Sequence, residues 1–84
     1  EIEELNTEIL MYPNPASKFI NLDLPFSESK YKINIYSITG ERVYENTMNY
    51  GNSKNINLDK FKSGLYFIDI ANDEISTREK LIIK

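Results

Sequence analysis

The side chains of this sequence that could do chemistry are carboxylates, amines and phenols. Its 84 residues include 13 Asp and Glu, 10 Lys and Arg and 6 Tyr, but no His and no Cys. This composition excludes Ser-His-Asp and Cys-His nucleophiles, imidazole metal sites, disulfides and zinc sites with sulfur ligands. Catalysis would depend on carboxylates, Lys or Tyr alone, so we expect a protein that is not an enzyme and that binds no cofactor.

One group of acidic residues near the C-terminus is a candidate metal site. Asp69 precedes a predicted turn, and Asp73 and Glu74 adjoin that turn. A calcium ion takes about six to eight oxygen ligands, usually from closely spaced acidic residues. No alternating series of Asp residues occurs here, so we interpret the group as ordinary turn polarity and expect no metal site.

Length and charge restrict the class of protein further. A chain of 84 residues that is 40% hydrophobic and 27% charged fits one globular domain. The formal net charge of −3 argues against a nucleic-acid partner and against binding to an anionic membrane. The apolar runs are too short for a transmembrane helix, so no membrane insertion is expected.

The first residues differ in charge from the rest. Four glutamates lie within the first eight residues, whereas the remaining residues carry a net charge of +1, ten basic minus nine acidic. We therefore predict an acidic linker or tail over residues 1–9 and a folded domain over residues 10–84. The sequence begins with Glu rather than Met and shows no signal peptide, so we expect a piece of a longer protein.

Hydrophobic and polar residues alternate through most of the predicted domain. Ile20, Leu22 and Leu24, for example, alternate with Asn21 and Asp23. A period of two is typical of strands with one buried face, and turn residues recur between these segments. The pattern predicts an all-β fold, a small Ig-like antiparallel β-sandwich of about seven strands. The predicted strands are residues 8–12, 18–24, 31–37, 41–47, 54–58, 65–71 and 75–84.

Glycines and asparagines mark the connections between these strands. A tight turn over residues 37–40 is expected to place Gly40 at positive φ. A polar loop is predicted at residues 49–53, another turn at residues 62–64, and a two-residue hairpin at Asn72 and Asp73.

The last predicted strand, residues 75–84, is expected to be an unpaired edge. Lys80 and Lys84 lie near its end. Lysine is an ordinary way to keep an exposed edge strand soluble, and such an edge can also bind a partner by strand addition.

Four segments in a fixed order resemble a known family. They are Tyr-Pro-Asn-Pro-Ala-Ser at residues 12–17, Ile-Tyr-Ser-Ile-Thr-Gly-Glu-Arg-Val at 35–43, the stretch 58–68 with Gly-Leu-Tyr-Phe-Ile, and Lys-Leu-Ile-Ile-Lys at 80–84. The set resembles the C-terminal sorting domain of the type IX (Por) secretion system, in its type A form. The resemblance covers about residues 10–84.

The resemblance implies a function without chemistry of its own. Such a domain directs a parent protein, with a cargo domain upstream of residue 1, from the periplasm through an outer-membrane translocon. Its partners would be that translocon, a shuttle protein, and a sortase-like peptidase that removes the domain after export. The cargo would then be attached to the cell surface or released, in a bacterium of the Bacteroidota.

The resemblance also implies the recognition residues. They either contact the translocon or hold the fold, and the sequence leaves these alternatives open. The candidates are Pro13, Asn14, Pro15, Gly40, Gly64, Tyr66, Lys80 and Lys84.

The alternative function is an Ig-like accessory module that binds carbohydrate or an adhesion partner. It requires Tyr36, Tyr44 and Tyr50 to form an aromatic platform on one exposed face. The sorting hypothesis instead predicts that Tyr36 and Tyr44 can be replaced singly with little loss of export.

Overall fold

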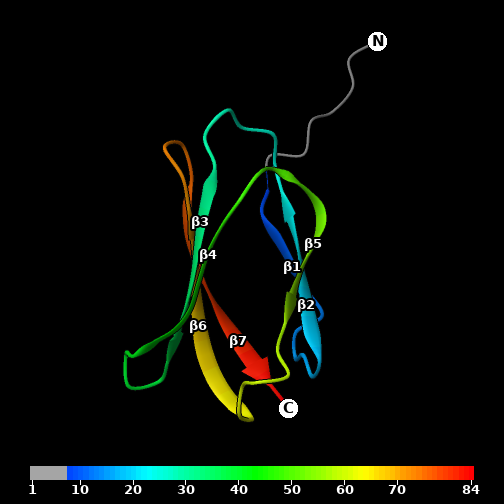
Figure 1. Cartoon of the computed structure of the whole chain (residues 1–84), viewed down its shortest axis with the longest axis vertical. Coiled ribbons are helices and arrows are strands. Elements are labelled where there is room, and N and C mark those ends of the chain that lie inside the picture. The colour runs from blue at the N-terminus through cyan, green and yellow to red at the C-terminus, as the bar shows by residue number, and fades with distance from the viewer. Residues whose placement is uncertain (1–7) are drawn as a thin grey trace.

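The computed structural model describes residues 8–84, which fold as an all-β sandwich (Figure 1). These residues contain no helix and form two antiparallel sheets, so the predicted Ig-like sandwich of about seven strands is confirmed. Most of the predicted linker, residues 1–7, lies outside the described residues. The strands are β1 (Leu10–Tyr12), β2 (Phe19–Leu24), β3 (Tyr31–Ser37), β4 (Arg42–Met48), β5 (Gly51–Asn57), β6 (Gly64–Ala71) and β7 (Ser76–Ile83).

The two sheets differ in size and enclose one core. The smaller sheet has the order β1-β2-β5, and the larger one has the order β4-β3-β6-β7. Alternate side chains of each strand point between the sheets because a strand is pleated, and this face is apolar. Thirteen hydrophobic residues are buried there: Ala16, Ile20, Leu22, Leu24, Tyr31, Ile33, Ile35, Ile56, Leu58, Ile68, Ile70, Leu81 and Ile83.

The connections divide between two opposite ends of the sandwich. At one end, which we call the linker end, β1 begins at Leu10 opposite Asp23, beside the loops at residues 25–30 and 72–75. At the other end, which we call the motif end, Ser37 lies opposite Tyr66 and Gly64 lies opposite Ile83. The bottom of Figure 1 shows the motif end, with the C-terminus labelled there.

The side chain of Asn72 joins the two loops of the linker end through hydrogen bonds. Its amide nitrogen donates to the Ser27 hydroxyl at 3.0 Å, and its amide oxygen accepts the backbone N–H groups of Glu74 and Ile75 at 2.8 and 2.9 Å. The Ser27 hydroxyl in turn donates to the Glu74 carboxylate at 3.1 Å. These bonds satisfy the polar groups of two loops at once, which is what buried loop backbone requires.

This network explains why the predicted two-residue hairpin at Asn72 and Asp73 is wrong. The strands stop at the pair Ala71 and Ser76, so the loop has four residues. Asn72 caps the loop from inside instead of occupying the tip of a tight turn.

The predicted polar loop at residues 49–53 is also too long. Strand β5 already begins at Gly51, which pairs with Leu24. The pairing shifts between Leu22 and Leu24, where Ser53 has a φ of 56° and donates its N–H to the Asp23 carboxylate at 2.7 Å. A bulge of this kind interrupts the alternation of buried and exposed residues, so the sequence pattern predicts a loop for this polar segment.

The other strands begin and end within two residues of their predicted limits. The ends of a strand are the part whose limits are least well defined. Leu58 lies just after the end of β5 and is still buried. Its N–H donates to the Lys18 carbonyl at 2.8 Å, which holds the backbone against the start of β2. In the part of the chain that the structure describes, no helix is long and apolar enough to cross a membrane.

Tyr31 makes the free energy of unfolding depend on pH in the alkaline range. Its buried side chain donates a hydrogen bond to the Pro25 carbonyl at 2.8 Å, and burial together with the nearby Glu74 carboxylate raises its pKa above the ordinary value. The unfolded chain therefore loses this proton first as the pH rises through about 10, and the free energy of unfolding falls as the pH rises further.

We expect Tyr31→Phe to reduce the free energy of unfolding by about 1–2 kcal/mol near neutral pH, because the Pro25 carbonyl loses its donor. The gap between wild type and variant should narrow above about pH 10. Urea unfolding between neutral and alkaline pH measures both. A gap that stays constant across this range would contradict the assignment.

Candidate recognition site at the motif end

A short segment after β1 is bonded to the outer edge of β7. The Asn14 amide nitrogen donates to the Lys80 carbonyl at 2.9 Å, and its amide oxygen accepts the Ile82 N–H at 3.1 Å. The Ala16 N–H then donates to the Ile82 carbonyl, and the Lys84 N–H donates to the Ala16 carbonyl, both at 2.8 Å. Residues 13–16, which we call the strap, thus extend the pairing of β7.

The composition of the strap explains this geometry. Pro13 and Pro15 have no N–H, so the backbone on either side of Asn14 cannot donate to a strand. The Asn14 side chain supplies both a donor and an acceptor, which replaces one step of a backbone ladder. The strap passes from side-chain pairing to backbone pairing at Ala16, whose small side chain is buried with 2% of its surface exposed.

The strap corrects the prediction that the last strand is an unpaired edge. From Lys80 to Ile83 the backbone of β7 is bonded on both sides, to β6 and to the strap, and Lys84, just after β7, is bonded to the strap. The half of β7 that begins at Ser76 has β6 as its neighbour in the sheet and lies beyond the strap. The proline segment and the lysine-flanked end, far apart in sequence, therefore form one structural unit.

The two glycine turns lie at the same end. The Gly40 N–H donates to the Ser37 carbonyl at 2.9 Å, and Gly40 has a φ of 94°, so the predicted turn with positive φ is confirmed. Gly64 has a φ of 152° and begins β6. The Tyr66 hydroxyl donates to the Lys62 carbonyl at 2.7 Å, which ties the loop before β6 to that strand.

All eight candidate residues thus gather at the motif end, although they come from four segments of the chain. The proline and asparagine side chains of the strap are exposed, as are Lys80 and Lys84. Only Tyr66 is half-buried, against the core. A partner at this end could contact most of the candidates together.

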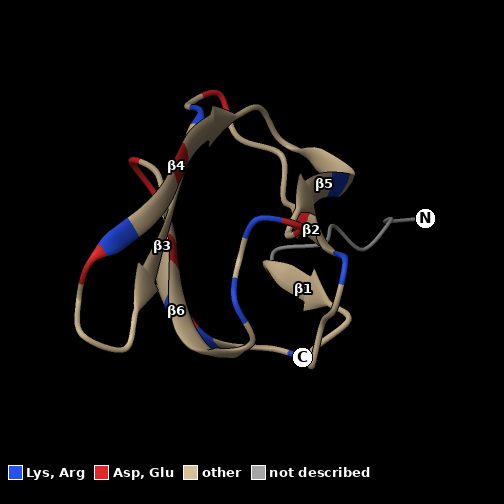
Figure 2. Cartoon of the chain, turned by 60° about the horizontal axis from the view of Figure 1, so that its bottom comes forward, with Lys and Arg blue, Asp and Glu red and all other residues tan. Residues whose placement is uncertain are grey.

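The motif end and the linker end differ in charge. Eight charged residues at the motif end, six basic and two acidic, give a net +4, and Figure 2 shows Lys and Arg on the segments around the C-terminus. Two further carboxylates border this group: Glu45, which pairs with Arg42 at 3.5 Å, and Glu79, which precedes Lys80. The linker end, with Glu8, Glu28, Lys30, Asp73 and Glu74, has a net charge of −3. The charged residues of the motif end are Lys18, Glu41, Arg42, Asp59, Lys60, Lys62, Lys80 and Lys84.

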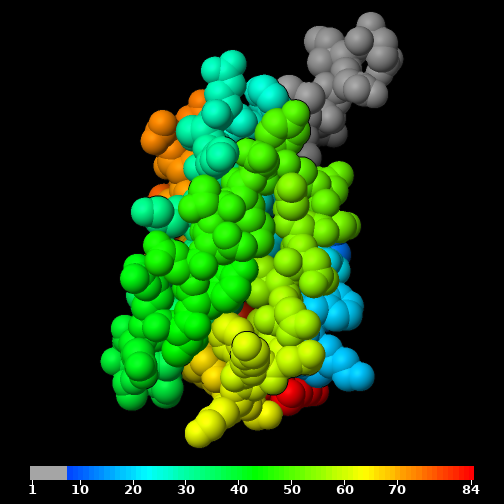
Figure 3. All heavy atoms as spheres, in the orientation of Figure 1, coloured from blue at the N-terminus to red at the C-terminus, as the bar shows by residue number. Residues whose placement is uncertain are grey.

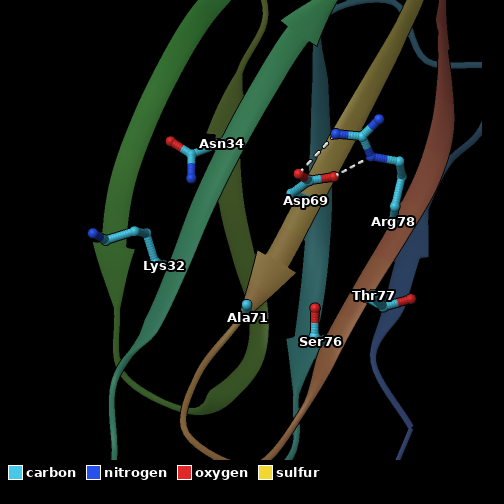
Figure 4. A pocket seen from close by; sticks show the side chains of 7 residues that line it. All are labelled: Lys32, Asn34, Asp69, Ala71, Ser76, Thr77 and Arg78. Carbon is cyan, nitrogen blue, oxygen red and sulfur yellow. Dashed lines mark hydrogen bonds and ion pairs between the residues drawn. The ribbon is translucent and has the colours of Figure 1, made fainter.

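Sequence reasoning missed an ion pair on the outer face of the larger sheet. Two guanidinium nitrogens of Arg78 donate to the two Asp69 carboxylate oxygens at 2.6 and 2.9 Å, which raises the Arg78 pKa (Figure 4). The same guanidinium lies 5.6 Å from the ring centres of both Tyr36 and Phe67. Arg78 and Asp69 are cross-strand partners, so correct strand register would have shown the pair.

The candidate calcium ligands do not come together. Asp69 lies in this ion pair on the sheet face, whereas Glu74 accepts a hydrogen bond from Ser27 at the linker end. Within residues 8–84 no group of three acidic, His or Cys side chains is placed to hold a metal ion.

The three tyrosines of the alternative hypothesis do not share a face. Tyr36 lies beside Arg78 on the outer face, whereas Tyr44 packs toward the core near Phe61, with ring centres 6.3 Å apart. Tyr50 contacts Phe26 at 4.8 Å between ring centres, at the linker end. The aromatic platform that the alternative requires is therefore absent from these residues.

The fold defines the class of this protein as a small all-β sandwich domain of two antiparallel sheets. Residues 10–84 match the family described as "Secretion system C-terminal sorting domain". The match covers nearly the whole chain, so the chain belongs to this family, the sorting domains of the type IX secretion system, as its sequence motifs predicted.

Two curated relatives are ulvan lyases by name. The chain is 35% identical over 74 residues to "Ulvan lyase NLR42" of Nonlabens ulvanivorans, covering 87% of this chain and 14% of the relative. It is 27% identical over 81 residues to "Endo-acting ulvan lyase" of Formosa agariphila, covering 95% of this chain and 16% of the relative. The chain therefore spans less than a fifth of the length of these relatives, and both sources fit the Bacteroidota.

The strap generates a stability prediction. Asn14→Ala removes a donor and an acceptor from the edge of β7, so we expect the free energy of unfolding to fall by about 1–3 kcal/mol. Urea unfolding measures the loss, and hydrogen exchange should show faster exchange of the Ile82 amide. Ser17→Ala, at an exposed position just after the strap, is the matched control; equal effects of the two variants would contradict the assigned pairing.

The Gly40 turn generates a second prediction. A Cβ on Gly40 would meet no atom within 4 Å, so any cost of a side chain there comes from its φ of 94°. We expect Gly40→Val to destabilise the domain by more than about 1 kcal/mol, and Gly40→Asn by less, because Asn tolerates positive φ better. Thermal melts followed by circular dichroism compare them; identical melts for Val, Asn and Gly would refute the turn assignment.

Proposed function

We propose that the chain is a non-catalytic export signal that the type IX outer-membrane translocon and a shuttle protein recognise through the motif end. A sortase-like peptidase would then remove it, and the cargo would be attached to the cell surface or released. The observation that supports this most is the convergence of all four family segments at one end of the fold.

The position of the cargo supports the proposal. The chain reaches β1 at the linker end, opposite the motif end, and strands of seven or eight residues separate them. At about 3.3 Å per residue this separation is roughly 25 Å. A parent domain upstream of residue 1 would then leave the candidate residues accessible, and residues 1–9 would act as the linker of domain 10–84.

The composition and the site both agree with a protein that acts as a ligand. The sequence has no His or Cys, and within residues 8–84 no three acidic side chains are placed to hold a metal ion. We infer that any enzymatic activity of the parent belongs to another domain. By analogy with the named relatives, a polysaccharide lyase is one class of cargo that such a tail could export.

Export of a reporter tests the proposal. A signal peptide and a fluorescent protein would be fused ahead of residues 1–84 and expressed in a Bacteroidota strain with an intact type IX system. We expect fluorescence at the surface or in the medium, and retention in the periplasm in a strain lacking the translocon. Equal retention in both strains would overturn the proposal and lead to a glycan-binding screen for the alternative function.

The structure shows which variants are informative in this assay. Deleting residues 81–84 removes Leu81 and Ile83, which are 0% and 2% exposed. Losing even one such side chain costs about 2–5 kcal/mol, much of the stability of a small domain, so loss of export would only report unfolding.

Lys80→Glu with Lys84→Glu changes exposed side chains and leaves the β7 backbone in place. If the lysines contact the translocon, export should fall at least about tenfold while the melting curve is kept. Full export of a folded double variant would remove both lysines from the recognition site.

A further inference from the structure

A pocket at the motif end has no role in holding the strap. It lies between the edge of β4 and the loop before β6, and its volume is about 330 Å³. Figure 3 shows this loop in yellow, directly beside the green residues of β4. The pocket is lined by Glu41, Val43, Lys60, Phe61, Lys62 and Tyr66.

The floor of the pocket is apolar and firmly held. The rings of Phe61 and Tyr66 meet edge to face, with centres 5.6 Å apart. The Phe61 N–H donates to the carbonyl of Leu58 at 2.9 Å, and Leu58 is 1% exposed. The loop is therefore anchored in the core, so a ligand would meet a preformed surface.

The wall of the pocket is an exposed apolar residue on an edge strand. Val43 is 41% exposed, and β4 is the outermost strand of the larger sheet. Further along β4, the Thr47 N–H already donates to the Asn46 side chain at 2.8 Å. The pairing of β4 with β3 also shifts between Ile35 and Tyr36, so Val43 is the extra residue of a bulge, and strand addition is hindered in both halves of β4.

The rim of the pocket is basic. Lys60 and Lys62 flank Phe61 in sequence and are exposed, and the pocket has a single acidic residue, Glu41. The surrounding motif end has the net +4 described above. A complementary ligand needs an apolar side chain for the floor and negative charge beside it.

We propose that this pocket binds an extended segment of a partner protein that passes beside Val43 and places an apolar side chain, flanked by carboxylates, over Phe61. This inference rests on the proposed function, because it names the chemistry of the partner at the motif end. Burial of the apolar side chain against Phe61 would give affinity, and the lysines would favour acidic flanks.

The reporter fusion tests the pocket through charge and shape. Lys60→Glu with Lys62→Glu should reduce export at least about tenfold with an unchanged melting temperature, because like charges then face the acidic segment. The matched control is Lys30→Glu with Lys32→Glu, the same charge change on exposed residues toward the linker end, and it should be exported normally. Val43→Asp should also lower export.

The outcomes separate failure of the pocket from failure of the proposed function. A wild-type fusion that is not exported overturns the proposed function. A wild-type fusion that is exported, together with an equally exported Lys60/Lys62 variant, overturns the pocket alone. Equal losses in the pocket variant and its matched control would also overturn it, because net charge rather than the pocket would then be responsible.

A photo-crosslinking residue at Val43 identifies the class of occupant during export. We expect an adduct with a protein, in which the attached peptide contains an apolar residue beside Asp or Glu, and no such adduct from the same residue placed at Phe26. Attachment to lipid or lipopolysaccharide, lysine-dependent sedimentation with phosphatidylglycerol vesicles, or no adduct at Val43 would each overturn the proposed occupant.

Discussion

The pairing of the strap with the last strand is the constraint on which the candidate recognition site depends. Two bonds from one asparagine side chain and two from the alanine backbone hold residues that are 66 to 68 positions apart in the sequence. Because prolines on both sides of Asn14 cannot donate, the side-chain amide makes the first contacts and allows the chain to turn into β2. The alternating core residues of β7 then pack beneath these bonds, so edge closure and core formation support each other.

The rest of the molecule holds the linker end and the motif end apart. The linker end is acidic and fastened by Asn72, whereas the motif end is basic and contains the four family segments. The sheets between them supply stiffness: β6 is paired along its whole length with β7 and from Tyr66 to Ala71 with β3. A sandwich is suited to this role because its loops cluster at two ends while the strands keep those ends apart.

The sequence predicted the strands because half-buried strands leave a period of two, clearest in Ile20, Leu22 and Leu24. It also predicted the Gly40 turn, whose chemistry is local. The strap was missed, since nothing near Asn14 indicates a partner 68 residues away. The Arg78–Asp69 pair and the placement of Tyr44 were missed for the same reason, as both depend on strand register. Ser53 was assigned to a loop because a bulge interrupts the alternation that identifies a strand.

The long sequence separation across the strap also means that the site forms only after synthesis has passed β7. The proline segment leaves the ribosome early in this domain, but its bonding partners are made more than sixty residues later. A polypeptide that stopped anywhere before β7 would present an unbonded strap, an open core and no assembled motif end. A cell that selects proteins for export by this surface would therefore discard prematurely terminated copies without a separate inspection step.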